Sequence, residues 1–268
     1  MTTLTAPERS EAARTPARAG NRQRAFARLL GTELRLFGRE PLALFWGVAF
    51  PLVLLIVLGI ATSKKPQHSL GDVKFIVAYT PVVMVFTLTI LALNGLPAVL
   101  ASYREKGYLR RLSTTPIGAW RLLTAQIVLN FAVSAVAVIL IAAIARIAFG
   151  VALPGQVGGF ALAMVLGAAA MLGLGTLISA IAPSPRIAGL VGSLLFFPMM
   201  FFAGLWVPRA EMGSVLRHVS DFTPLGALVA AVQNTEAGHW AGMTHLLVLV
   251  AWALIMCLAA GRLFRWEQ

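Results

Sequence analysis

The sequence has few charged residues and a single cysteine. Charged residues make up 12% of the 268 positions, whereas hydrophobic residues make up 59%. A soluble domain carries about twice that charged fraction, so this deficit excludes an ordinary soluble protein and indicates an integral membrane protein. The lone Cys257 cannot form an intrachain disulfide, and its position in an apolar run predicts a buried, inert thiol.

Motifs that bind nucleotides or metals, or that perform hydrolysis, are also absent. There is no G-x-x-x-x-G-K-[ST] loop to cradle ATP phosphates, and no H-E-x-x-H, G-x-S-x-G or paired-cysteine pattern. The four histidines are scattered, and chance placement explains them better than a metal site. We therefore predict that the chain is not an enzyme and has no cofactor or metal of its own.

Six long runs without a charged residue follow the N-terminal region. They cover residues 41–63, 75–103, 122–145, 157–182, 187–208 and 243–261. At about 1.5 Å per residue each can cross a hydrocarbon core of about 30 Å, which predicts an all-α membrane protein with six transmembrane helices. The absence of charge within the runs argues against proton- or sodium-driven carriers and against channels built from charged rings.

The N-terminal region divides into two parts. Residues 1–24 are polar and Arg-rich without an apolar run, which predicts a disordered cytoplasmic tail rather than a cleaved secretory signal. Residues 25–40 carry apolar side chains on one helical side and arginines opposite, which predicts an amphipathic elbow helix at the membrane interface. Glu33 falls on the apolar side. It either faces a partner or a pore, or pairs with a neighbouring arginine.

The basic residues are unevenly distributed. The net charge is +12, and eight of the 22 basic residues fall in the first 39 positions, which favours membrane lipids with anionic headgroups over nucleic acid as a partner. If the N-terminus is cytoplasmic, sixteen basic residues lie on that side and six on the other. The positive-inside rule therefore predicts that both termini are cytoplasmic.

Residues 208–240 are longer than a simple loop. Apolar residues recur at helical spacing, Pro224 interrupts the pattern, and a second apolar stretch follows. This pattern predicts a re-entrant helical hairpin on the outer side, before the sixth span. Such backbone is tolerated at membrane depth only where it packs on protein or faces a cavity.

Polar side chains are rare within the predicted spans. Asn94 and Asn130 lie at similar depths on consecutive spans, so a hydrogen bond between them is geometrically feasible, and Gln126 lies one helical turn from Asn130. We predict that these three residues make interhelical polar contacts that support packing.

Residues 104–116, between the second and third spans, have a distinctive pattern. Tyr108, Leu109 and Leu112 can share one helical face, and Pro116 ends the helix. Their spacing resembles the first cytoplasmic loop of ABC-2 type membrane permeases, which reads E-x-G-T-L-x-x-L-x-x-T-P. The matching residues are Glu105, Gly107, Leu109, Leu112, Thr115 and Pro116. Tyr108 stands where the family has Thr.

The resemblance implies a six-span ABC-2 type transmembrane domain over residues 41–268. It also implies that residues 104–116 form a coupling helix that docks on a separate ABC ATP-binding subunit, which holds ATP and Mg²⁺. Two permeases, identical or closely related, would pair around a central path in the bacterial plasma (inner) membrane.

The cargo remains open at this level. Small outer loops favour efflux of a hydrophobic or amphipathic small molecule, as in drug export and antibiotic resistance. The same family pattern accommodates export of a lipid-linked glycan or polysaccharide. A membrane scaffold or enzyme subunit that transports nothing is the alternative from another class.

Overall fold

The computed structural model describes residues 19–62, 75–108 and 119–263, and this described part is entirely helical apart from its turns. Six of its helical segments are long and apolar enough to cross a membrane, as the sequence predicts. They are Pro41–Thr62, Phe75–Glu105, Trp120–Phe149, Val157–Ile181, Pro185–Ala203 and Met243–Leu263. Several continue past the uncharged runs, because helical hydrogen bonding does not stop where the hydrocarbon ends.

The first two spans are each interrupted by a short π-helix. The first consists of α2 (Pro41–Leu44), η1 (Phe45–Ala49) and α3 (Phe50–Thr62). The second consists of α4 (Phe75–Ile90), η3 (Leu91–Gly95) and α5 (Leu96–Glu105). A proline follows each π-helix closely and cannot donate a hydrogen bond to the preceding turn, which accounts for the local widening.

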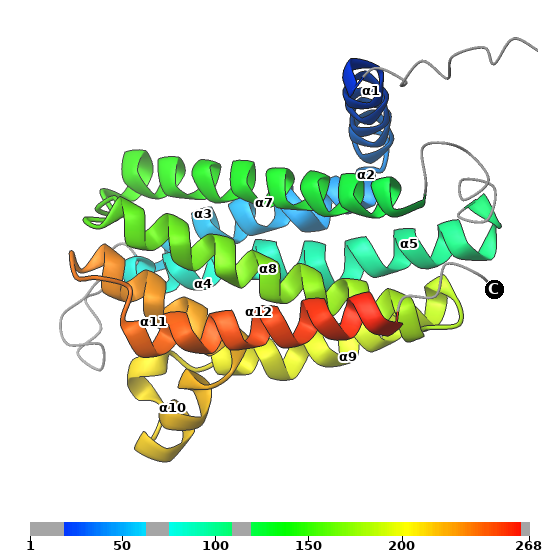
Figure 1. Cartoon of the computed structure of the whole chain (residues 1–268). Helices are drawn as coiled ribbons and strands as arrows, with labels where there is room; N and C mark the ends of the chain where they lie inside the picture. Colours follow the sequence, from blue (N-terminus) through cyan, green and yellow to red (C-terminus); the bar gives the residue numbers. More distant parts are fainter. Residues whose placement is uncertain (1–18, 63–74, 109–118, 264–268) are drawn as a thin grey trace, which may run out of the picture.

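The second span lies at the centre of the bundle. It contacts α7 (Ala119–Phe149), α8 (Val157–Ile181) and α9 (Pro185–Ala203), and α12 (Met243–Leu263) packs along α8 (Figure 1). The ends of α5, α8 and α12 lie at one end of the bundle together with α1 (Ala19–Phe37), and we call this the α1 end (Figure 1). The functional features described below lie at this end or halfway along the bundle.

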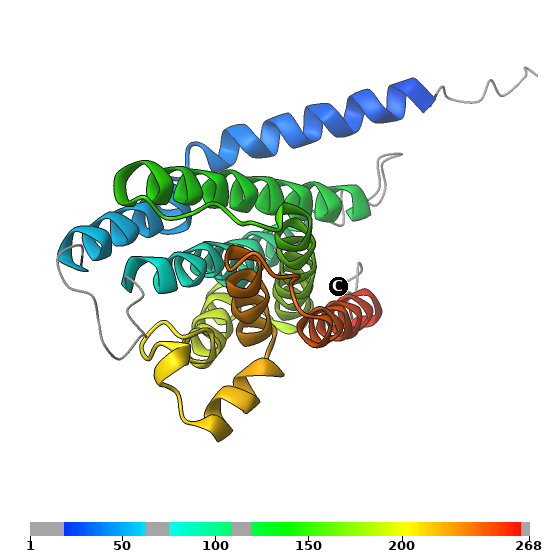
Figure 2. The ribbon, with the colours of Figure 1, turned by 90° about the vertical axis from the view of Figure 1, so that its left-hand side faces the viewer.

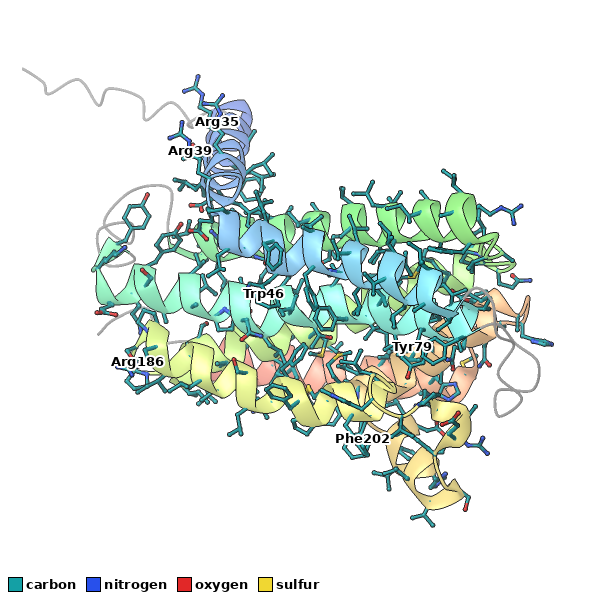
Figure 3. All side chains as sticks on the ribbon, turned by 180° about the vertical axis from the view of Figure 1, so that it is seen from behind. Arg35, Arg39, Trp46, Tyr79, Arg186 and Phe202 are labelled. Carbon is teal, nitrogen blue, oxygen red and sulfur yellow. The ribbon has the colours of Figure 1, made fainter. Side chains whose placement is uncertain are left out.

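The elbow helix α1 begins at Ala19, before its predicted start at residue 25, and ends at Phe37. It lies beside α7, outside the bundle of spans (Figure 2). Arg35 projects outward from it, Arg39 lies in the turn that follows it, and Arg186 lies at the same end of the bundle (Figure 3). The exposed Leu34 and Leu36 give this helix apolar surface as well, as an interfacial helix requires.

The predicted hairpin before the sixth span is present as a bent helix pair. α10 (Ser214–Asp221) and α11 (Pro224–Glu236) meet at 96°, and Thr223 caps α11 by accepting a hydrogen bond from the Gly226 N–H. α11 is buried against α8 and α12, whereas α10 extends away from the bundle at the end opposite α1 (Figure 1).

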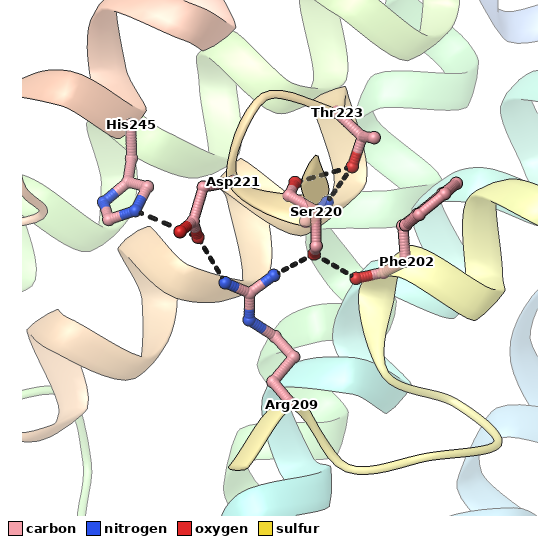
Figure 4. A network of polar contacts seen from close by, with 7 residues as sticks. Phe202, Arg209, Ser220, Asp221, Thr223 and His245 are labelled. Atoms are coloured by element: carbon pink, nitrogen blue, oxygen red, sulfur yellow. Dashed lines mark hydrogen bonds and ion pairs between the residues drawn. The ribbon is translucent and has the colours of Figure 1, made fainter. Parts of the chain in front are cut away.

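A polar network holds this hairpin to its neighbours (Figure 4). The buried Arg209 guanidinium donates hydrogen bonds to the Ser220 hydroxyl and the Asp221 carboxylate. Ser220 in turn donates to the Phe202 carbonyl of α9, and His245 of α12 lies 3.5 Å from the same Asp221 oxygen. The network therefore joins the end of α9, both hairpin helices and the start of α12.

The prediction that the Cys257 thiol is buried is wrong, because its side chain is exposed on α12. An apolar run identifies a span but not which of its faces is packed, since lipid tails are as apolar as a protein core. The Cys257 thiol lies 3.8 Å from the Ala169 carbonyl, at the edge of the contact between α12 and α8.

Candidate functional site

A cavity of about 720 Å³ lies among the first, second, third and fifth spans and reaches the segment that joins α1 to the first span. Most of its wall is apolar, and Trp46 of η1 lies on this side of the molecule (Figure 3). We call it the central pocket. Its lining residues include the apolar residues Leu42, Trp46, Ile90, Leu91, Ala98, Val99, Phe196 and Phe197, the neutral polar residues Asn94, Gln126, Asn130 and Ser193, and the charged residues Arg39 and Glu40.

The three predicted polar residues all line this pocket, but with partners other than those expected. The Asn94 side-chain oxygen accepts a hydrogen bond from the Ser193 hydroxyl of α9 at 2.9 Å. Asn130 donates to the Gln126 carbonyl of its own helix at 2.8 Å. The feasible Asn94–Asn130 bond is not among the contacts of the described residues. Asn94 therefore joins the second span to the fifth instead of the third.

The position of Asn94 depends on the π-helix η3 and on two glycines that face it. Pro97 has no N–H to offer the carbonyls of η3, and the Ala92 and Leu93 carbonyls lie against Gly175 of α8 and Gly192 of α9. A Cβ atom at Gly192 would lie only 2.9 Å from the Leu93 carbonyl carbon. The two glycines thus allow both helices to approach η3 closely, and this contact fixes the wall from which Asn94 projects.

Glu33 is buried between α1 and the spans, with 5% of its surface exposed. Its Oε2 atom accepts hydrogen bonds from the Tyr103 hydroxyl at 2.8 Å and from the Gln126 amide at 2.7 Å. Burial raises the pKa of Glu33 above its ordinary value, and the two hydrogen bonds partly oppose this shift. Neither interpretation offered by the sequence describes this arrangement, in which the carboxylate links α1 to α5 and α7.

The structure describes the first part of the predicted coupling segment. Glu105 ends α5, Gly107 has a left-handed φ of 66°, and the Tyr108 ring lies 5.4 Å from that of Tyr103. The left-handed conformation explains the glycine, because other residues are strained there. The other predicted positions, Leu109, Leu112, Thr115 and Pro116, lie outside the described residues.

Arg104 makes a contact that sequence reasoning missed. Its guanidinium donates hydrogen bonds to the Ser179, Ala180 and Ala182 carbonyls at the C-terminal end of α8. These carbonyls have no partner within the helix, and a cation is favoured at this end of the helix dipole. In the sequence, an arginine at the end of a span indicates which end of the span is cytoplasmic. Nothing in the residues around Arg104 indicates that it caps a different helix, α8.

Comparison with known proteins places these features in a family. The sequence model of the ABC-2 type transporter matches residues 24–237, which include most of α1, the first five spans and the hairpin. The chain belongs to the ABC-2 type transporter family. A search of curated proteins found no match.

Membership in this family indicates what kind of protein contains the central pocket and the contacts described above. The ABC-2 chain is a multi-pass membrane permease, a kind of subunit that lacks the ATPase domain, and the family implies an ATP-binding partner subunit. The family match includes residues 104–116 and all residues of the central pocket named above. Sequence reasoning did not anticipate that Ser193 bonds Asn94, that Arg104 caps α8, or that Glu33 bonds Tyr103 and Gln126.

Proposed function

We propose that this permease exports a hydrophobic or amphipathic small molecule, such as a drug or an antibiotic, and that a separate subunit binding ATP and Mg²⁺ drives the transport. The observation that carries the proposal is the composition of the central pocket. Apolar and aromatic side chains form most of its wall, the amides of Asn94 and Asn130 supply neutral hydrogen-bonding groups, and Arg39 and Glu40 add one charge of each sign. A cavity of about 720 Å³ lies within the size range of small-molecule sites.

We further propose that two copies of the chain face each other across the central pocket in a bacterial plasma membrane. A homodimer is the simplest assembly that encloses a pocket lying among the first, second, third and fifth spans.

In this proposal the α1 end of the bundle faces the cytoplasm. Arg35, Arg39 and Arg186 at this end support the assignment through the positive-inside rule (Figure 3).

Residues 104–116 are the proposed docking element for the ATP-binding subunit. The segment begins in the last turn of α5. Because α5 belongs to the central second span, which lines the pocket, a displacement of this segment can move the pocket wall. Gly107 and the exposed Tyr108 support a turn that presents side chains outward. The ATP-binding subunit would close on this element, and the helices around the pocket would rearrange.

Co-purification with the ATP-binding subunit tests the docking element. Leu109→Asp and Leu112→Asp should each reduce the amount of ATPase retained by the solubilised permease by about tenfold, because a charge would replace an apolar contact. Leu153→Asp is the matched control, since Leu153 is exposed and lies in the turn that joins α7 to α8, outside residues 104–116. Equal retention by all three variants would refute docking through this segment.

Transport in inside-out vesicles tests the cargo class. ATP-dependent uptake of an amphipathic dye such as rhodamine 6G should require both subunits and should fall when Asn94→Leu removes the hydrogen bond to Ser193. Uptake of a lipid-linked glycan without uptake of any apolar dye would contradict the proposed cargo.

The topology is tested separately in a Cys257→Ala background. Ser113→Cys and Ser214→Cys should be labelled from opposite sides of the membrane, and labelling from the same side would contradict the six-span topology.

A further inference from the structure

Two adjacent residues at the end of α5 attach it to different parts of the protein. Tyr103 donates a hydrogen bond to Glu33 of α1, and Arg104 donates to the carbonyls that end α8. Both residues immediately precede Glu105, the first position of the proposed docking motif. A displacement of residues 104–116 therefore pulls on α1 through the Tyr103 hydrogen bond and on α8 through the Arg104 hydrogen bonds.

The contact with α1 is partly buried. Leu122 of α7 is fully inaccessible and packs with Leu29, Tyr103 and Ala180, which come from α1, α5 and α8. Glu33 lies in the same region with 5% of its surface exposed. The bond from Gln126 to Glu33 is buried, and a hydrogen bond in such surroundings is stronger than in water. The bond from Tyr103 to Glu33 is partly buried, because both residues also line a second cavity of about 540 Å³.

Gln126 extends this contact to the central pocket. Its amide donates to Glu33, and its side chain also lines the pocket. One helical turn further along α7, Asn130 lines the pocket and donates to the Gln126 carbonyl. A continuous set of bonded groups thus runs from Tyr103 through Glu33 and Gln126 to the pocket wall.

A purely structural anchor would not need an ionisable group here. Burying a carboxylate costs free energy, and an apolar side chain of similar size is often as stabilising as a buried charged group. What the carboxylate adds is a single acceptor atom that receives two donors from two different spans. That geometry fixes the positions of α1, α5 and α7 relative to one another.

We propose that Glu33 is a positioning residue that transmits movement of the docking segment to the wall of the central pocket, through Tyr103 on one side and Gln126 on the other. The inference rests on the proposed function, because it requires an ATP-binding subunit at residues 104–116. Glu33 touches neither ATP nor cargo in this scheme. It determines whether a movement of α5 also moves Gln126.

The test follows the pocket directly and needs no knowledge of the cargo. Ala98→Cys, in a Cys257→Ala background, places a thiol in the central pocket without removing a hydrogen bond. The rate of its reaction with a maleimide is measured in the complex with the ATP-binding subunit, in nanodiscs, with and without ATP. ATP hydrolysis and thermal unfolding are measured on the same samples.

Glu33→Ala and Tyr103→Phe should each reduce the ATP-dependent change in labelling rate by about tenfold, while ATP hydrolysis continues. Glu33→Gln should retain most of the change, because the amide oxygen can accept both hydrogen bonds. Combining Glu33→Ala with Tyr103→Phe should cause no further loss, since both remove the same link. Thr32→Val is the control, because the Thr32 hydroxyl donates to the Arg28 carbonyl of its own helix.

The outcomes separate this inference from the proposed function. If ATP does not change the labelling of Ala98→Cys with Glu33 intact, or if the ATP-binding subunit does not co-purify, the proposed function fails. If ATP changes the labelling equally with Glu33 intact and with Glu33→Ala, only the inference is overturned. The inference is also overturned if the variants lose the ATP-dependent change in labelling only in proportion to their lower thermal stability, and if Glu33→Gln does not restore it. Glu33 would then only stabilise the fold.

Discussion

Replacing Gly192 by alanine should open the contact between α9 and the π-helix of the second span. The added methyl carbon would lie 2.9 Å from the Leu93 carbonyl carbon and closer still to its oxygen. Carbon atoms normally approach to about 3.5–4.0 Å, so the two helices must separate by roughly 1 Å. The atoms that collide belong to the backbone and cannot rotate away.

The expected magnitude follows from two opposing effects. Overpacking costs about 1–3 kcal/mol, and a collision with backbone belongs at the upper end of that range. Alanine in place of glycine within a helix contributes about 1 kcal/mol in the opposite direction. Gly192→Ala should therefore lower the free energy of unfolding by about 2 kcal/mol.

Gly189→Ala is the matched control, one helical turn earlier on α9. A Cβ atom at Gly189 has no neighbour within 4 Å, so only the favourable helix propensity remains. Denaturant unfolding of both variants in detergent, followed by tryptophan fluorescence, should separate them by about 3 kcal/mol. Because Asn94 lies on the displaced π-helix, Gly192→Ala should also weaken rhodamine 6G transport. Equal unfolding free energies would refute the close contact.

Two further predictions concern stability. Burial raises the pKa of Glu33, so its ionisation costs stability as the pH rises above the ordinary glutamate value. The melting temperature of Glu33→Gln should therefore rise relative to that of the unaltered protein as the pH increases above the ordinary glutamate pKa. A difference in melting temperature that stays constant with pH would contradict this. Arg209→Ala leaves the partly exposed Asp221 without its cation and should destabilise the hairpin by about 2 kcal/mol, seen as faster hydrogen exchange in α10. Arg217→Ala, an exposed arginine of α10, should leave exchange unchanged.

The sequence by itself determined the number of spans, the elbow helix and the bent pair. A membrane span must be a continuous apolar run of a length set by the bilayer, and its backbone hydrogen bonds form locally. The amphipathic pattern of α1 and the proline between α10 and α11 are local signals in the same sense. The family resemblance at residues 104–116 also needed only neighbouring residues, and the family match confirmed it.

The tertiary structure decided which polar groups meet and which faces are packed. Glu33 bonds Tyr103 and Gln126, which lie 70 and 93 residues away in the chain, and Asn94 bonds Ser193 instead of Asn130. Cys257 is exposed although its run is apolar. In a membrane, lipid and protein interior are equally apolar, so hydrophobicity cannot tell a packed helix face from a lipid-facing one. Only the arrangement of the helices sets those contacts.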